Sequence, residues 1–394
     1  MKKLITFLSI CTTVAILALP VAARTTIAQP DNSIQDPCST EGKEALYKSF
    51  LANRTDKQDK AYEDAKKYLA CPADAQVTEA QQKIIDYLKK FVTKYDEVMK
   101  KVVYRTKIYN EQKYAEGYAL GKDILATEPE NLKVLVDLGA NGYLVLPLKN
   151  PALTAEALVY ATKALQMIES GKMVDDWQPL ASKDVAVAYL NYTIGTISLE
   201  KDPAAALKNL IKAAQFETPL KKSPYTYAYI AGAYETGPYL KQSEEYNLKH
   251  KGKDETPESK LALANINQIV DRMIDAYARA VALAGTDPKF TAAKEGWNKS
   301  LTDWYKFRNN DKTDGMDQMV AGILSKPLPP EPTPLTSLPA TTPAATPATG
   351  TPQSGNGAGT AATTSAPAGA KPTGTPKPGD KPRNRLNRFN RNNR

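Results

Sequence analysis

The pattern of hydrophobic and polar positions predicts that helices dominate the 394-residue chain from about residue 37 to about residue 325. Segments rich in Ala, Leu, Lys, Glu and Gln carry apolar residues three and four positions apart, the period of a helix with one buried side. The clearest segment has apolar residues at Ile84, Ile85, Leu88, Phe91, Val92, Tyr95, Val98 and Met99. Alternation of period two between turn signals is lacking, so we expect an all-α fold without a sheet.

Prolines divide this helical region into short pieces, because proline removes a backbone donor and clashes with the preceding turn. The breaks fall at Pro72, Pro129, Pro151, Pro203, Pro219, Pro224 and Pro288. We therefore expect antiparallel helical hairpins over residues 37–326, interrupted by loops near residues 144–155 and 236–258.

Several of these pieces resemble the tetratricopeptide repeat. Tyr114 lies where that family has an aromatic residue opening its second helix, Pro129 matches the closing proline, and Leu138-Gly139 matches the Leu-Gly pair that lets two helices pack closely. Ile194-Gly195 repeats the pattern, and Ala231-Gly232 does so more weakly. The resemblance covers about residues 103–290 and implies a solenoid of five or six stacked hairpins. The alternative is a non-repeating helical domain that contains one or two such units.

The resemblance also implies a concave surface that binds a protein or peptide partner. Alignment on the Leu-Gly pairs assigns to it Lys133, Tyr143, Tyr189, Tyr192, Thr226 and Tyr229. Tyrosine offers a large rigid contact area with a polar tip. The competing interpretation is that tyrosines at helical spacing pack the hairpins together.

The N-terminal end has the pattern of an export signal. Lys2 and Lys3 precede an apolar run that ends in Pro20-Val21-Ala22-Ala23, which predicts a signal peptide over residues 1–23 cleaved after Ala23, with Ala28 as the second choice. The alternative is an uncleaved membrane anchor. Residues 24–36 are expected to form a flexible segment, and the mature protein is expected to be exported to a periplasmic or extracellular location.

The C-terminal end differs sharply in composition. Residues 327–394 contain 14 of the 28 prolines and carry +6 of the net charge of +9. Such a segment cannot bury enough apolar surface to offset the entropy of ordering it, so we expect a disordered Pro/Thr/Ala-rich linker over residues 327–382. Residues 383–394 form a basic tail whose arginines could bind an anionic envelope polymer or membrane surface: Arg383, Arg385, Arg388, Arg391 and Arg394.

The two cysteines of the mature chain, Cys38 and Cys71, flank a predicted helical hairpin with a polar turn near residues 54–56. If the hairpin is antiparallel, both cysteines lie at the same end, and export favours their oxidation. We therefore expect a Cys38–Cys71 disulfide. A closed zinc site is not expected, because His250 is the single histidine.

The sequence offers little support for catalysis. His250 stands in a charged stretch without a nucleophile nearby, and no glycine-rich phosphate loop is present. The Asp175-Asp176 and Glu244-Glu245 pairs leave a carboxylate-based hydrolase open as a further alternative. We expect a non-enzymatic scaffold or adaptor without cofactor or metal, and do not expect nucleic acid as a partner. An attachment protein that acts through its basic tail is the rival hypothesis, and the oligomeric state stays open.

Overall fold

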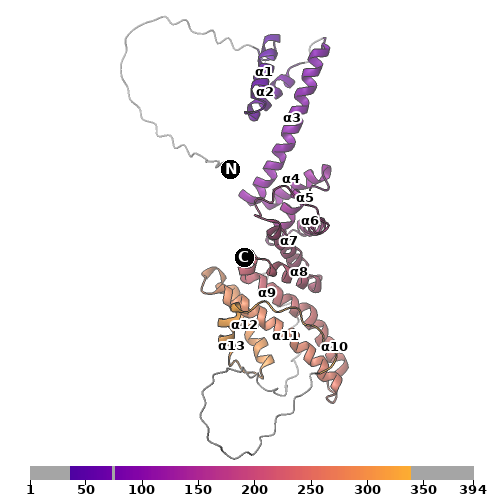
Figure 1. Ribbon diagram of the computed structural model, residues 1–394, viewed down its shortest axis with the longest axis vertical. Coiled ribbons are helices and arrows are strands. Elements are labelled where there is room, and N and C mark those ends of the chain that lie inside the picture. Colours follow the sequence, from indigo (N-terminus) through magenta and orange to yellow (C-terminus); the bar gives the residue numbers. More distant parts are fainter. Residues whose placement is uncertain (1–35, 73–75, 339–394) are drawn as a thin grey trace, which may run out of the picture. The chain divides into compact units, whose positions relative to one another are not determined.

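A computed structural model describes residues 36–72 and 76–338 (Figure 1). The expected signal peptide, the segment up to residue 35, the linker from residue 339 and the basic tail lie outside the described residues. The described chain contains helices and connecting segments without a β-strand, which confirms the all-α expectation. None of the described helices has the length and apolar character needed to cross a membrane.

The described chain divides into two compact units between residues 98 and 99, and the division falls within α3 (Glu79–Arg105). The first unit contains α1 (Thr40–Asn53), α2 (Gln58–Ala70) and the beginning of α3. Ser39 caps α1 by accepting a hydrogen bond from the Gly42 amide. The core forms around the fully buried Phe50, whose ring meets that of Phe91 edge to face at 5.0 Å.

The disulfide joins Cys38, before α1, to Cys71, after α2, with their Cα atoms 5.2 Å apart. Both the expected hairpin and its disulfide are therefore confirmed. The two cysteines are 33 positions apart in the sequence, and their bond closes this loop in a unit whose core is small. Such a covalent closure reduces the entropy of the unfolded chain and so stabilises the hairpin.

The second unit is a succession of packed helices. The first of them are η1 (Thr106–Asn110), α4 (Tyr114–Thr127), α5 (Leu132–Ala140), η2 (Gly142–Leu148) and α6 (Pro151–Glu169). Next come α7 (Lys183–Ser198), α8 (Pro203–Gln215), η3 (Pro219–Lys222) and α9 (Pro224–Tyr234). The last are η4 (Glu235–Tyr239), α10 (Leu240–His250), α11 (Pro257–Ala284), η5 (Pro288–Phe290), α12 (Thr291–Arg308), α13 (Met316–Gly322) and η6 (Ile323–Ser325). Pro151, Pro203 and Pro224 begin α6, α8 and α9, where the missing amide removes no helical hydrogen bond.

Neighbouring helices pack in sequence from α5 to α9 and then onto α11 and α12 (Figure 1). Two glycines permit close approach. A Cβ at Gly139 would lie 2.7 Å from the Ala161 Cα of α6, and one at Gly195 would lie 2.6 Å from the Leu210 Cγ of α8. Gly232 has no atom within 4 Å of its would-be Cβ, so the weaker Ala231-Gly232 match does not mark a close packing site.

Two expected features differ in the structure. The segments near residues 144–155 and 236–258 are largely helical, because η2, η4 and α10 occupy them. The expected linker does not begin at residue 327, since residues 327–335 are held along α11 by hydrogen bonds to their backbone. The composition argument counted the apolar surface of that segment alone, whereas the folded body supplies the surface against which it packs.

Candidate functional site

The principal candidate site is a stripe of tyrosine rings across three elements of the second unit. We define the aromatic stripe as Tyr143 of η2, Tyr189 and Tyr192 of α7, and Tyr225 and Tyr229 of α9. Ring centroids are 6.0 Å apart for Tyr143–Tyr189, 5.2 Å for Tyr143–Tyr192, 6.2 Å for Tyr192–Tyr229 and 6.4 Å for Tyr225–Tyr229. These separations are typical of interacting aromatic pairs. The five rings are therefore connected, with Tyr192 linking Tyr143 to Tyr229.

Local sequence explains how the stripe assembles. Tyr189 and Tyr192 lie three positions apart on α7, and Tyr225 and Tyr229 lie four apart on α9, so each pair shares a helix face. Gly142 lets η2 approach α7, because a Cβ there would lie 2.5 Å from the Thr193 Cγ2. The Tyr143 amide then donates to the Thr193 hydroxyl at 3.2 Å, which holds Tyr143 beside α7.

Exposure differs along the stripe. The four other tyrosines of the stripe are partly exposed, whereas Tyr192 is 5% exposed and lies buried in contact with the Tyr143 and Tyr229 rings. Burial raises the pKa of Tyr143 to about 12 and also raises the pKa of Tyr189 and Tyr225. These phenols therefore stay neutral at physiological pH and can donate hydrogen bonds. The Tyr189 and Tyr225 hydroxyls make no hydrogen bond to the described part of the protein.

The aromatic contacts continue beyond the stripe. Tyr225 meets Phe290 of η5 at 5.7 Å and Trp297 of α12 at 5.3 Å, both edge to face. Sequence reasoning missed these two residues, because they lie outside the segments aligned on Leu-Gly pairs. Their signal in the sequence is weak: only the spacing of Trp297, Leu301 and Trp304 marks a buried helix face.

The structure brings together four of the six residues expected on the partner-binding face, namely Tyr143, Tyr189, Tyr192 and Tyr229. The prediction that Thr226 lies on the exposed face is wrong, because Thr226 is fully buried. Its hydroxyl has no hydrogen-bond partner among the described residues. Tyr192 is buried, so it does not contact a partner directly as the sequence predicted. The Lys133 ammonium is engaged in a separate polar cluster.

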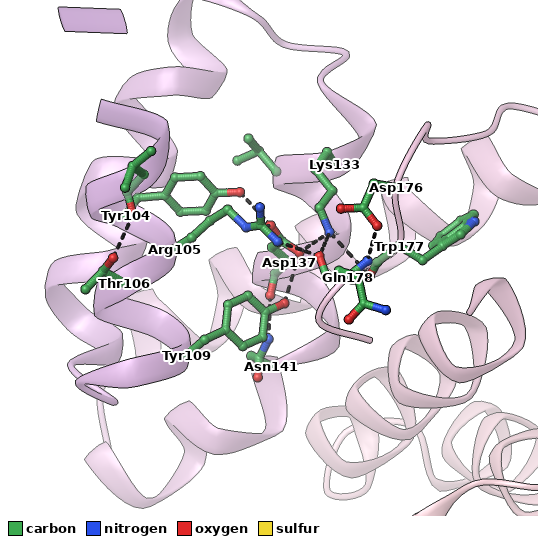
Figure 2. Close-up of polar contacts among 12 residues, drawn as sticks. Tyr104, Arg105, Thr106, Tyr109, Lys133, Asp137, Asn141, Asp176, Trp177 and Gln178 are labelled. Carbon is green, nitrogen blue, oxygen red and sulfur yellow. Dashed lines mark hydrogen bonds and ion pairs between the residues drawn. The ribbon is translucent and has the colours of Figure 1, made fainter. Parts of the chain in front are cut away.

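That cluster surrounds Asp137, a fully buried carboxylate in the middle of α5 (Figure 2). The Tyr104 hydroxyl donates to Asp137 Oδ2 at 2.7 Å, and the Tyr109 hydroxyl donates to Oδ1 at 2.9 Å. Lys133 Nζ lies 2.9 Å from Oδ1 and Arg105 Nε lies 3.3 Å from Oδ2. Two hydroxyl donors and two cations therefore satisfy the buried charge.

The same cations hold the loop before α7. The Gln178 carbonyl accepts hydrogen bonds from both Lys133 Nζ, at 2.6 Å, and the Arg105 guanidinium (Figure 2). Burial, and then the Asp137 charge, raise the pKa of Tyr104 and Tyr109, so both phenols remain protonated donors. The cluster thus fixes the segment that leads into the helix carrying Tyr189 and Tyr192.

Neither the Asp137 cluster nor the acidic pairs considered in the sequence have an arrangement typical of catalysis. The Asp137 carboxylate is inaccessible and its acceptors are occupied. Asp175, Asp176, Glu244 and Glu245 are exposed, and His250 ends α10 beside the Tyr246 ring at 5.3 Å. Within the described ranges, no three His, Cys, Asp or Glu side chains are grouped as a metal site requires.

The chain matches no protein-family model, no curated protein and no solved structure. The aromatic stripe and the Asp137 cluster therefore rest on the geometry of this chain alone.

Proposed function

We propose that the protein is an exported, non-enzymatic scaffold or adaptor that binds a protein or peptide partner through the aromatic stripe. The observation that carries the proposal is the set of four partly exposed tyrosines on η2, α7 and α9, whose rings are joined through the buried Tyr192. Interaction hot spots are enriched in Tyr and Trp that lie close together on a rigid support. A stripe built on packed helices loses little side-chain entropy on binding, which favours affinity.

The architecture in this proposal is a tetratricopeptide-like solenoid. Its support is the close approach at Gly139 and Gly195 and the packing of α5 with α6, α7 with α8, and α9 with α11. In such an array neighbouring hairpins present equivalent helices on one side, and this produces an extended binding surface. The export signal in the sequence and the Cys38–Cys71 disulfide together favour an oxidising compartment as its location.

Site-specific photo-crosslinking tests the proposal. A benzoylphenylalanine at Tyr189 is expected to capture a defined protein in the native compartment. The matched control carries the same group at Val159 of α6, which is 60% exposed and lies outside the stripe. Equal capture at both positions, or capture at neither, would argue against the stripe as the binding surface.

A further inference from the structure

Residues 327–335, which we call the strap, lie along α11 and are held through their backbone. The Pro327 carbonyl accepts from Arg279 at 2.7 Å, and the Pro330 carbonyl accepts from Arg272 at 2.7 Å. Asn265 holds Leu335 twice: its Oδ1 accepts from the Leu335 amide at 2.7 Å, and its Nδ2 donates to the Leu335 carbonyl at 3.2 Å. None of these contacts requires the side chains of the strap.

The three holding residues share one face of α11. Asn265, Arg272 and Arg279 are seven positions apart, so they recur after two helical turns and span about 21 Å. The eight steps from Pro327 to Leu335 cover about 25 Å in a polyproline II conformation. The strap runs opposite to α11 along the chain, and the spacing of the holding residues fits an extended peptide.

From Pro329 onward the strap also shows the three-residue period of polyproline II. Pro329, Pro332 and Leu335 are partly buried, whereas Pro330, Glu331, Thr333 and Pro334 are exposed. Leu328 packs against the hydrophobic core of the unit. One side of an extended peptide is therefore turned toward the body while the prolines reduce the entropy lost on ordering.

Arg279 is the most deeply buried of the three residues that hold the strap. Its side chain is 5% exposed and pairs with Asp275 at 2.7 Å, and the Pro327 carbonyl satisfies a further donor of its guanidinium. A buried donor left without an acceptor is unfavourable. A competing peptide that places a backbone carbonyl here would satisfy the same donor.

The strap fills the groove incompletely. A cleft of about 120 Å³ lies between the strap and the helices, lined by Tyr234, Gln268, Ile269 and strap residues 331–334 among others. The Tyr234 residue is 2% exposed, and its hydroxyl has no hydrogen-bond partner in the described chain. The Tyr234 hydroxyl beside this cleft is therefore a buried polar group that the strap leaves without a partner.

We propose that this groove is a second binding site, specific for an extended proline-rich peptide from a partner protein, and that the strap is its internal competitor. The backbone contacts and the period of three define the class of ligand, and the buried Tyr234 hydroxyl, which the strap leaves without a partner, favours a ligand other than the strap. The site is separate from the aromatic stripe and does not depend on it.

The test uses the full-length oxidised protein and a fluorescein-labelled synthetic peptide with the sequence of residues 326–338. Leu328→Asp weakens the strap by placing a charge against the core, and Pro329→Gly/Pro332→Gly weakens it without a charge. We expect saturable binding of the peptide to both variants, with a dissociation constant below about 1 mM, the scale of concentration a short tether supplies. Wild type should bind it at least about tenfold more weakly, because its own strap occupies the groove.

The control adds Asn265→Ala and Arg272→Ala to each strap variant, two partly exposed positions whose loss leaves the core intact. Binding should then disappear while the melting temperature stays within a few degrees. A Gly/Ser peptide of equal length should bind at least about tenfold more weakly, because it lacks the polyproline II preference.

Two results would overturn the proposal. One is the absence of saturable binding to both folded strap variants, or binding that Asn265→Ala and Arg272→Ala leave unchanged. The other is a concentration-dependent dimer of the wild-type protein, measured by light scattering, that the same two substitutions abolish. That dimer would assign the groove to the strap of a second copy.

Discussion

The buried Asp137 carboxylate offers the sharpest test of how the second unit is held together. Asp137→Ala leaves Tyr104 and Tyr109 without their acceptor, and Tyr104 is 1% exposed. An unsatisfied buried hydroxyl costs about 1–3 kcal/mol. The side chains of Lys133 and Arg105 are 23% and 37% exposed, so both cations can turn to water and the loss of their ion pairs adds only about 1 kcal/mol.

The expected loss is therefore roughly 4 kcal/mol in the free energy of unfolding. For a unit of this size that corresponds to a melting temperature lower by about 8–16 °C. Urea unfolding followed by tryptophan fluorescence measures it selectively, because Trp177, Trp297 and Trp304, the three tryptophans of the chain, all lie in the second unit.

Two matched variants separate the causes. Asp137→Asn keeps the shape and one acceptor but loses the charge, so its loss should be intermediate. Asp123→Ala removes an exposed carboxylate, 67% accessible, that pairs with Lys100 at 3.8 Å, and should change stability by less than about 0.5 kcal/mol. If Asp137→Ala unfolds at the same urea concentration as Asp123→Ala, the cluster does not stabilise the unit and the reasoning is wrong.

Four further outcomes follow from the structure. Gly139→Val should lower the unfolding free energy of the second unit by about 1–3 kcal/mol or more, because the added side chain overpacks against Ala161. Gly232→Ala should raise it by about 0.5–1 kcal/mol, because nothing lies within 4 Å of the added Cβ. Urea titrations that gave equal shifts for the two variants would contradict this. Reduction of Cys38–Cys71 should destabilise the first unit by about 3–4 kcal/mol, visible in circular dichroism, while the tryptophan transition stays in place. Because the pKa of Tyr104 is raised in the folded protein, its phenol loses a proton at a lower pH in the unfolded state, near the ordinary pKa of 10.0. The stability is therefore retained below about pH 10 and falls as the pH rises further. Tyr104→Phe should reduce that alkaline slope by up to about 1.4 kcal/mol per pH unit, and an unchanged slope would refute the assignment.

Local signals made much of the fold predictable from the sequence. The polar turn between two amphipathic segments gave the first hairpin, and the position of Cys38 and Cys71 outside its helices then predicted their disulfide. Gly139 and Gly195 were recognised from adjacent residues in a helical pattern, and each lies where another helix approaches. These features depend on residues close together in the chain.

The Asp137 cluster could not be assembled in the same way. Its members come from α3, η1, α5 and the loop before α7, and Gln178 contributes a backbone carbonyl that has no sequence signature. The available signal was Asp137 itself, a charged residue in the apolar run LKVLVDLGA. A buried charge in such a run requires partners, but the pattern does not say which residues they are.

Exposure was the other quantity that the sequence left open. Alignment on the Leu-Gly pairs gave the register of Tyr189, Tyr192 and Thr226 but not the depth of each side chain. That depth depends on how η2 and α8 pack on α7 and on how α8 and α11 pack on α9. The strap was missed for a related reason. Its composition predicts disorder in isolation, whereas Asn265, Arg272 and Arg279 of α11 provide the hydrogen bonds that order it.

The affinity of the crosslinked partner for purified protein tests the central claim most directly. We expect calorimetry to show Tyr189→Ala/Tyr225→Ala binding about 30-fold more weakly or worse than wild type, because two hot-spot tyrosines contribute about 1–2 kcal/mol each. Val159→Ala should bind as wild type does, and all three proteins should melt cooperatively. Equal affinity of the folded double variant and wild type would contradict the assignment of the aromatic stripe as the partner-binding surface.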